Sequence, residues 1–232
     1  MRRLLSLLLR AAVGVSAVVL LAVGLFALVD PPTTPYMASE SRRLGGVEQV
    51  WVPLEAIAPV MARAAVAAED AGFCGHWGLD LDAIRAAMAE GSDRGASTIS
   101  QQVVKNVFLW QGRSWVRKAI EAGLTPVMEA LWPKARILEV YLNVAEFGEG
   151  VFGVEAAARN HFGVSAADLT DVQAARLAAI LPDPKHRDPA NPSDALRARA
   201  GGILDGAATI RADGRAACFE APGRAADQAG GP

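Results

Sequence analysis

Residues 136–158 read RILEVYLNVAEFGEGVFGVEAAA, and this stretch decides the expected fold. Apolar pairs recur at helical spacing, first Ile137 with Leu138 and then Tyr141 with Leu142, so the first half predicts a helix with one face in a core. Three glycines follow, and they permit a tight, closely packed turn. The stretch therefore predicts two helices joined by a compact turn.

Helical spacing of apolar residues continues over most of the chain, whereas alternating runs of β-branched residues are short and rare. This pattern predicts a mainly α domain over residues 49–215. The expected helices cover residues 54–68, 81–89, 97–109, 115–131, 134–143, 154–162, 171–180 and 193–212. Residues 216–232 are expected to form a disordered tail, because its end is rich in Ala, Gly and Pro with little to bury.

The first thirty residues form a separate apolar segment. Residues 11–29 are all apolar, Gly or Ser, and together with residues 4–9 they exceed the ~20 residues that a membrane-crossing helix needs. The alternative is a cleaved secretory signal, although the small-x-small cleavage pattern is missing before Asp30. We predict a membrane anchor over residues 1–30, with a cytoplasmic amino terminus because three arginines precede the apolar run. Residues 31–48, where prolines cluster at the start, are expected to be a juxtamembrane linker.

Composition excludes some classes of function. The net charge of the chain is −2, and without the three arginines of the anchor the rest carries −5, so a basic field for nucleic acid is absent. The two cysteines, Cys74 and Cys218, match no zinc or CxxC spacing, which argues against a metal knuckle or a disulfide framework. A single bridge between them remains open.

The densest group of reactive side chains lies at residues 69–80, which read EDAGFCGHWGLD at the end of an apolar helix. Glu69 faces the negative pole of the helix dipole and lies beside aromatic bulk, and both effects would raise its pKa toward that of a useful general base. The alternative interpretation is a cluster of helix caps and salt bridges.

A second motif, RGASTISQQVVKN at residues 94–106, runs from a small-residue turn into a helix. Polar residues recur there at intervals of four, in two stripes that together make one polar face with a single cation. The stripes are Ser97, Gln101 and Lys105, and next to them Thr98, Gln102 and Asn106. Free N–H groups at a helix amino end, followed by a lysine, suit a phosphate or pyrophosphate. A solvated helix face is the alternative.

A third motif places Arg113, Arg117 and Glu121 four residues apart, with Lys118 beside them. Three cations around one carboxylate would stabilise the charge that develops when a glycosyl phosphate bond breaks. An exposed ion pair of little energetic value is the alternative for Arg117 and Glu121.

Five blocks, in this order, resemble the glycosyltransferase domain of peptidoglycan polymerases, and specifically the monofunctional biosynthetic peptidoglycan transglycosylases. The blocks are EDAGFCGHWGLD, RGASTISQQVVKN, FLWQGRSWVRKAIEAGLT, RILEVYLNVAEFGEGVFGVEAAA and ARLAAILPDP, which fall within residues 50–190. The resemblance implies a lysozyme-like, mainly helical fold with a membrane-facing small lobe. It also implies that the substrate is lipid II, the undecaprenyl-pyrophosphoryl disaccharide-peptide.

The resemblance assigns roles to particular residues. Glu69 would act as general base on the 4-hydroxyl of the acceptor sugar, with inversion at C1 of the donor and release of undecaprenyl pyrophosphate, and Glu121 would also be required. The cations expected near the pyrophosphate are Lys105, Arg113, Arg117 and Lys118, and the residues expected to line the cleft are Ser97, Gln101, Gln102 and Asn106. Further substrate-binding candidates are Asp70, Phe73, His76, Asn143 and Glu155, although burial with a satisfied partner is the default for Asn143 and Glu155.

The resemblance implies no covalent cofactor and no identifiable metal ligands, and it leaves a stimulating divalent cation, Mg²⁺ or Mn²⁺, open. The expected partners are lipid II, the growing glycan chain, the membrane, and cell-wall synthesis and division proteins, without nucleic acid. The expected location is the inner membrane, with one span and a periplasmic catalytic domain.

The sequence departs from the commoner pattern in three places. Gly95-Ala96-Ser97 replaces Gly-Gly-Ser, as in monofunctional relatives; the segment 89–94 is short; and His161 stands where Tyr is usual. No transpeptidase domain is expected after residue 212. A lytic enzyme of the lysozyme type and a non-enzymatic membrane scaffold are the alternative classes, and the cation cluster favours synthesis over both.

Overall fold

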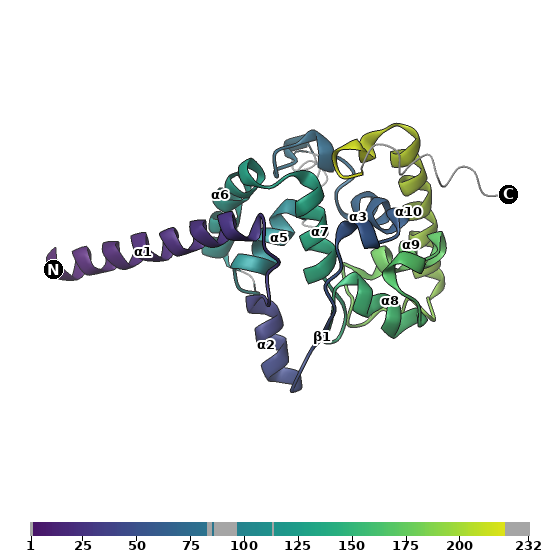
Figure 1. The fold of residues 1–232 in the computed structure, drawn as a ribbon, viewed down its shortest axis with the longest axis horizontal. Helices are drawn as coiled ribbons and strands as arrows, with labels where there is room; N and C mark the ends of the chain where they lie inside the picture. Colours follow the sequence, from purple (N-terminus) through teal and green to yellow (C-terminus); the bar gives the residue numbers. More distant parts are fainter. Residues whose placement is uncertain (1, 83–84, 86–96, 113, 221–232) are drawn as a thin grey trace.

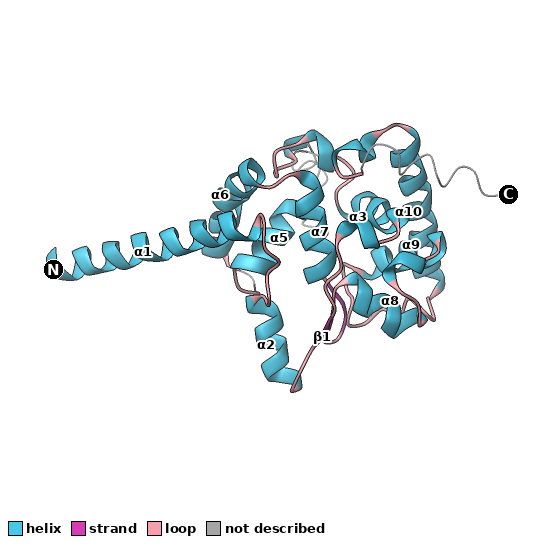
Figure 2. Cartoon of the chain, viewed as in Figure 1, coloured by secondary structure: helices cyan, strands magenta, loops and turns pink. Residues whose placement is uncertain are grey.

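The computed structural model of the chain describes residues 2–82, 85, 97–112 and 114–220, and they are mainly helical (Figure 2). The helices are α1 (Arg2–Phe26), α2 (Pro35–Leu44), α3 (Pro59–Glu69), α5 (Ile99–Phe108), α6 (Trp115–Leu131), α7 (Lys134–Val144), α8 (Val154–Phe162), α9 (Asp171–Ile180) and α10 (Asp194–Ala212). Short 3-10 turns are η1 (Leu54–Ala56), η2 (Phe73–Gly75), η3 (Ala166–Asp168) and η4 (Arg215–Cys218). The prediction of a mainly α fold is confirmed.

Most of the predicted helices begin and end where the capping residues place them. α6, α8 and α9 have the predicted bounds, and α5, α9 and α10 begin after Thr98, Thr170 and Ser193, whose hydroxyl oxygens accept a backbone N–H of the first turn. The single helix predicted over residues 54–68 is wrong. It is divided into η1 and α3 because Pro59 has no N–H and starts a new helix. The helix predicted over residues 81–89 falls largely outside the described residues.

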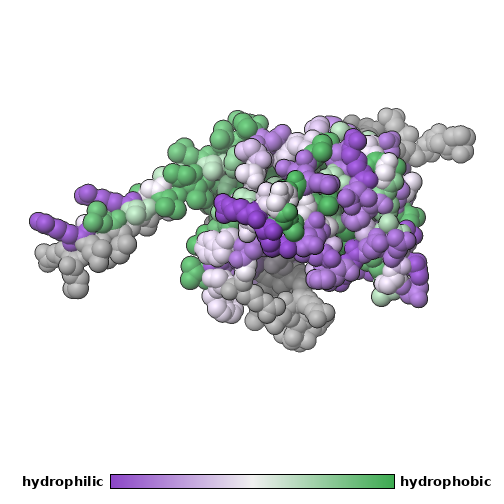
Figure 3. Space-filling model, turned by 90° about the horizontal axis from the view of Figure 1, so that it is seen from below, coloured by the Kyte–Doolittle hydropathy of each residue, from purple (hydrophilic) through white to green (hydrophobic). Residues whose placement is uncertain are grey.

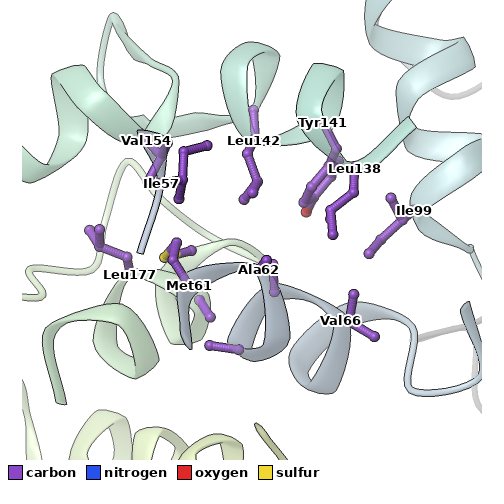
Figure 4. Packing of buried hydrophobic residues seen from close by; sticks show 14 of the residues in the cluster. Ile57, Met61, Ala62, Val66, Ile99, Leu138, Tyr141, Leu142, Val154 and Leu177 are labelled. Atoms are coloured by element: carbon purple, nitrogen blue, oxygen red, sulfur yellow. The ribbon is translucent and has the colours of Figure 1, made fainter. Parts of the chain in front are cut away.

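The helices form two packed groups. The first group consists of α3, α9 and α10, which contact one another. The second group consists of α5, α6 and α7, in which α5 contacts both of the others. α1 meets this second group through its contact with α6 (Figure 1). Between the groups, α3 turns Ala62 and Val66 toward Leu138 and Tyr141 of α7 (Figure 4). Small residues bring α3 and α10 close together, since a Cβ on Gly206 would lie 3.1 Å from the Cβ of Ala67. The last turn of α3 is therefore packed against both α10 and α7.

A small three-stranded sheet, which the sequence patterns did not predict, joins the two groups. Its order is β1 (Glu48–Gln49), β3 (Val151–Phe152) and β2 (Glu146–Gly148), with β1 parallel and β2 antiparallel to β3. The predicted glycine turn is confirmed. Gly153 has φ +81°, and a Cβ there would lie 2.9 Å from the carbonyl oxygen of Asn143.

The linker predicted over residues 31–48 is wrong for most of its length, because residues 35–44 form α2. Thr34 caps this helix, and Pro35 occupies its first turn. α2 packs against α5, and the Tyr36 ring meets Phe152 edge to face at 5.4 Å. The segment that leaves the anchor is thus part of the folded domain.

The tail predicted over residues 216–232 begins too early. Residues 215–218 form η4, and Cys218 makes a disulfide with Cys74, which answers the question that the cysteine spacing left open. Phe219 is buried, and Glu220 pairs with Arg63 at 2.7 Å. The rest of the predicted tail, residues 221–232, lies outside the described residues.

α1 is long and apolar enough to cross a membrane, with a mean hydropathy of 2.2 over Leu9–Phe26, although a signal sequence meets the same criterion. Figure 3 shows it leaving the body as a largely hydrophobic rod with hydrophilic residues toward its far end. Only its carboxyl end is docked. Val23 is buried, and its carbonyl oxygen accepts the indole N–H of Trp132 at 2.8 Å.

Candidate active site

Glu69 is the last residue of α3, and its side chain is 15% exposed. The amide of Gln102, on α5, donates to Glu69 Oε2 at 2.9 Å, and Arg199, on α10, lies 3.9 Å from Oε1. Burial raises the pKa of Glu69, although the Gln102 hydrogen bond and the charges of Arg199 and Lys105 oppose that rise. A raised pKa makes this carboxylate a stronger base than an exposed glutamate.

Glu121 lies on α6, and its side chain is only 3% exposed. Each carboxylate oxygen has its own cation: Arg117 Nη1 contacts Oε2 at 2.5 Å, and Lys118 Nζ contacts Oε1 at 2.5 Å. Lys118 also donates to Ser97 Oγ at 3.0 Å. The Arg117–Glu121 ion pair, for which an exposed position was the alternative interpretation, therefore has a buried carboxylate.

Lys105 connects these two acids electrostatically. Burial lowers its pKa, while the charges of Glu121 and Glu69 raise it and those of Arg117 and Lys118 lower it further. Lys105 and Gln102 lie one turn apart on α5, and Gln102 is bonded to Glu69. The structure thus brings the predicted base and the predicted cation cluster into one site.

A cavity of about 160 Å³ opens beside Lys105. Its lining is mainly polar, with amide, hydroxyl, ammonium and carboxylate groups beside a few apolar side chains: Tyr36, Gln102, Lys105, Asn106, Gln111, Tyr141, Ala145, Glu146, Leu181 and Pro184. Gln111 donates to Asn106 at 3.2 Å, which orients the Asn106 amide. A lining of this composition suits a polar ring with an apolar face.

Three predicted binding residues are directed into the protein. Asp70 accepts the backbone N–H of Ile99 at 3.0 Å and the Nε2–H of His76 at 2.8 Å, and the N–H of Gly78 donates to His76 Nδ1 at 3.1 Å. Phe73 is fully buried, with the Lys134 ammonium 4.5 Å above its ring. Asp70, Phe73 and His76 therefore hold the segment after Glu69 against the start of α5.

Gln101 is likewise a structural residue. Its side-chain oxygen accepts the N–H of Thr98, and the Thr98 hydroxyl accepts the N–H of Gln101, so the two residues form a capping box. The Thr98 hydroxyl also donates to the Gly78 carbonyl at 2.6 Å. The polar stripe of α5 is therefore divided: Gln102, Lys105 and Asn106 line the cavity, while Gln101 fastens the helix start.

The structure does not bring Asn143 and Glu155 to this site. Asn143 is fully buried and exchanges hydrogen bonds with the backbone N–H and C=O of Val52 at 2.9 and 2.8 Å. Glu155 accepts from Arg159 at 2.6 Å and from the Ala166 N–H at 2.7 Å. Their hydrogen bonds join neighbouring segments of the fold, so the interpretation as buried residues with satisfied partners describes both.

Among the described residues, one cluster of acidic and histidine side chains resembles a site for a divalent cation, but two of its three residues already use their ligand atoms. Ligand atoms of Asp70, His76 and Asp80 lie within 4.8 Å of one another. Asp70 and His76, however, already use these atoms for each other and for the N–H groups of Ile99 and Gly78. The cluster does not fit a metal in this arrangement.

Sequence reasoning missed three residues of the site. Arg199 is far from the motifs in sequence, and only the packing of α10 on α3 brings it to Glu69. Tyr36 falls in the predicted linker, and no role is predicted for Glu146, yet both line the cavity. The predicted site residue Arg113 and the departures at residues 89–96 lie outside the described residues.

Comparison with known proteins assigns the chain to a family. A family model described as transglycosylase matches residues 38–208. A biosynthetic peptidoglycan transglycosylase of Jannaschia sp. (strain CCS1) is 63% identical over 212 residues, which are 91% of this chain and 89% of that protein. Proteins of the same name from Rhodospirillum centenum and Caulobacter vibrioides are 51% and 46% identical, over 84% and 85% of this chain and 86% and 88% of those proteins.

The chain therefore belongs to the transglycosylase family, and it is a glycosyltransferase enzyme. The match begins within α2 and ends within α10, so it includes every described residue of the site except Tyr36.

Proposed function

We propose that this enzyme is a peptidoglycan transglycosylase that polymerises lipid II into β-1,4-linked glycan strands and releases undecaprenyl pyrophosphate. The observation that carries the proposal is geometric. α5 carries Lys105 one turn after Gln102, which is bonded to Glu69, and α5 packs against α6, where two cations bind the carboxylate of Glu121. The names of the relatives support the peptidoglycan substrate.

Glu69 is proposed to act as the general base. It takes the proton from the 4-hydroxyl of the acceptor N-acetylglucosamine, and the oxygen then attacks C1 of the donor N-acetylmuramic acid from the face opposite the leaving group. The bond from C1 to the pyrophosphate oxygen breaks, and its electron pair leaves with that oxygen. Since burial raises the pKa of Glu69, its carboxylate is a stronger base than an exposed glutamate.

The cation cluster is proposed to stabilise the departing pyrophosphate. Lys105, Arg117 and Lys118 are the described cations at this position, and fixed charges in a partly desolvated site stabilise developing negative charge more than water does. Glu121 holds Arg117 and Lys118 at defined positions, because each of its carboxylate oxygens binds one of them. Without this negative charge, the two cations would repel each other. Divalent cation dependence remains a prediction, and no step here uses one.

We infer that α1 spans the inner membrane with its amino terminus in the cytoplasm, so that the catalytic domain is periplasmic. The disulfide between Cys74 and Cys218 supports export, since such bonds persist in oxidising compartments. α6 adds an exposed apolar face next to α1, and Trp115 on it is 91% exposed. This face would bring the site close to the lipid tail of the substrate. Cell-wall synthesis and division proteins are the proposed partners.

Purified full-length protein, incubated in detergent or vesicles with fluorescent lipid II, is expected to produce long glycan chains that lysozyme digests. Glu69→Gln removes the proton acceptor and preserves the shape, so it should reduce polymer formation by at least about a hundredfold, within the range measured for general bases. Its melting temperature should stay close to that of the parent. Substantial polymer from Glu69→Gln would eliminate this residue as the base, and hydrolysis of finished glycan instead of synthesis would favour a lytic enzyme.

A further inference from the structure

The carboxyl-terminal residues 215–220, which we call the C-terminal clasp, fasten the segment that follows the catalytic base. The clasp is joined covalently to η2 by the disulfide between Cys74 and Cys218, whose Cα atoms are 5.7 Å apart. Next to this bond, the ring of Phe219 packs against Phe73 with centroids 6.3 Å apart. Phe73 and Cys74 lie four and five residues after Glu69, so both contacts act directly on the catalytic segment.

Two further contacts reinforce the clasp. Arg215 donates to the carbonyl oxygen of Ala71 at 3.1 Å. Glu220 pairs with Arg63 at 2.7 Å, and both side chains are nearly buried, so this end of the clasp is fixed to α3 itself. The family match ends at residue 208, which means that the clasp lies beyond the part of the chain that the family model describes.

The fastened segment carries the link between the base and the cation cluster. Asp70 accepts the N–H of Ile99, the first residue of α5, and α5 carries Gln102 and Lys105. Movement of residues 70–76 would therefore weaken both the Asp70 bond to α5 and the Gln102 bond to Glu69. The clasp contacts this segment at Ala71, Phe73 and Cys74, whereas α5 contacts it at Asp70.

We propose that the C-terminal clasp is a positioning device for the catalytic base: it holds residues 70–76 so that Glu69 keeps its alignment with Gln102 and Lys105. The inference rests on the proposed function for its kinetic readout. The residues of the C-terminal clasp do not touch the reacting atoms. They act through residues 70–76, which they hold.

The test compares the oxidised full-length enzyme with the double variant Cys74→Ser/Cys218→Ser, both assayed with lipid II well below their melting temperatures. We expect kcat to fall at least about fivefold, with KM within twofold of the parent, because small displacements of a catalytic group cost rate more than binding. The matched control is Leu177→Ala, which removes core packing in α9 and changes none of the clasp contacts described above; it should lower the melting temperature while keeping kcat within twofold. A double variant with lower thermal stability and kcat within twofold of the parent would overturn the proposal.

Amide hydrogen exchange at Ile99 gives a readout independent of turnover. Loss of the disulfide should speed exchange of this N–H at least about tenfold, since its acceptor is Asp70, whereas Leu177→Ala should not change it selectively. Unchanged exchange at Ile99 in the double variant would also overturn the proposal. If the oxidised parent makes no glycan, the proposed function fails, and the exchange measurement alone then decides the role of the clasp.

Discussion

Glu69 receives its two polar contacts from helices that belong to different packed groups. Gln102 on α5 donates a hydrogen bond, and Arg199 on α10 supplies a nearby charge. Burial alone would favour the protonated acid, which cannot accept a proton. The two contacts oppose that effect, and the net result is a raised pKa of Glu69.

Removing Arg199 should therefore change the pH dependence of the reaction. Arg199→Ala deletes a positive charge 3.9 Å from the carboxylate, which raises the pKa of Glu69 further. Activity that needs the ionised form is lost as pH falls through this pKa, so the acid limb of the kcat profile should move to higher pH. Arg199→Lys keeps the positive charge, so its acid limb should lie close to that of the parent. An acid limb in the same place for the parent and Arg199→Ala would contradict the assignment.

The cations of the site should separate into catalytic and structural effects. Lys105→Ala removes a partly buried cation from the proposed leaving-group site, so we expect a fall of at least about tenfold in kcat/KM for lipid II with little loss of thermal stability. Unchanged kcat/KM in Lys105→Ala would remove the proposed pyrophosphate role.

Arg117→Ala leaves the buried Glu121 with one cation fewer, and it should lower both activity and melting temperature. Steady-state kinetics together with thermal melts would measure both effects.

At the residue scale, the sequence predicted which side chains lie together when those residues are close in the sequence. Arg117, Lys118 and Glu121 could be placed together because helical spacing fixes their separation. Arg199 could not, since its approach to Glu69 depends on how α10 crosses α3, which no motif states. Asp70 and His76 were identified as important, but their direction into the protein follows from tertiary contacts with Ile99 and Gly78.

At the scale of elements, the long amphipathic helices were predicted well because caps and periodicity agree on them. α2 was missed because two prolines precede it, a third is its first residue, and it carries few apolar side chains. Tertiary packing on α5 stabilises it. The sheet was missed because its strands have two or three residues, too few for an alternating pattern to be recognised.

The turn between α7 and α8 should tolerate a side chain at Gly153 poorly. Gly153→Ala places a Cβ 2.9 Å from the Asn143 carbonyl at a φ of +81°, so we expect a loss of about 2 kcal/mol or more in the free energy of unfolding. Gly163→Ala is the matched control, because its φ is +69° but no atom lies within 4 Å of the added Cβ, and about 1 kcal/mol is expected there. Denaturant unfolding measures both. Equal losses would show that steric contact with Asn143 is unimportant.

At the scale of the whole molecule, the surface beside α1 should determine access to a lipid-linked substrate. Val116→Ser lowers the apolarity of the exposed face of α6, where Val116 is 67% exposed, and it should raise the KM for lipid II several-fold in vesicles without changing the melting temperature. Val172→Ser on α9, where Val172 is 50% exposed, is the control and should leave KM unchanged. Equal effects from the two variants would argue against a membrane contact at α6.

The docking of α1 has a mechanical consequence. The carbonyl oxygen of Val23 is bonded to Trp132, and Arg136 donates to the carbonyl oxygens of Phe26 and Val29, so the exit of α1 is fastened to the end of α6 and the first turn of α7. With α1 in the bilayer, as we propose, a flexible tether would let the rest of the chain move through a wide range of heights above the membrane. The fixed attachment would instead hold the proposed base at a nearly constant height, so that each new sugar would be added at the same distance from the bilayer.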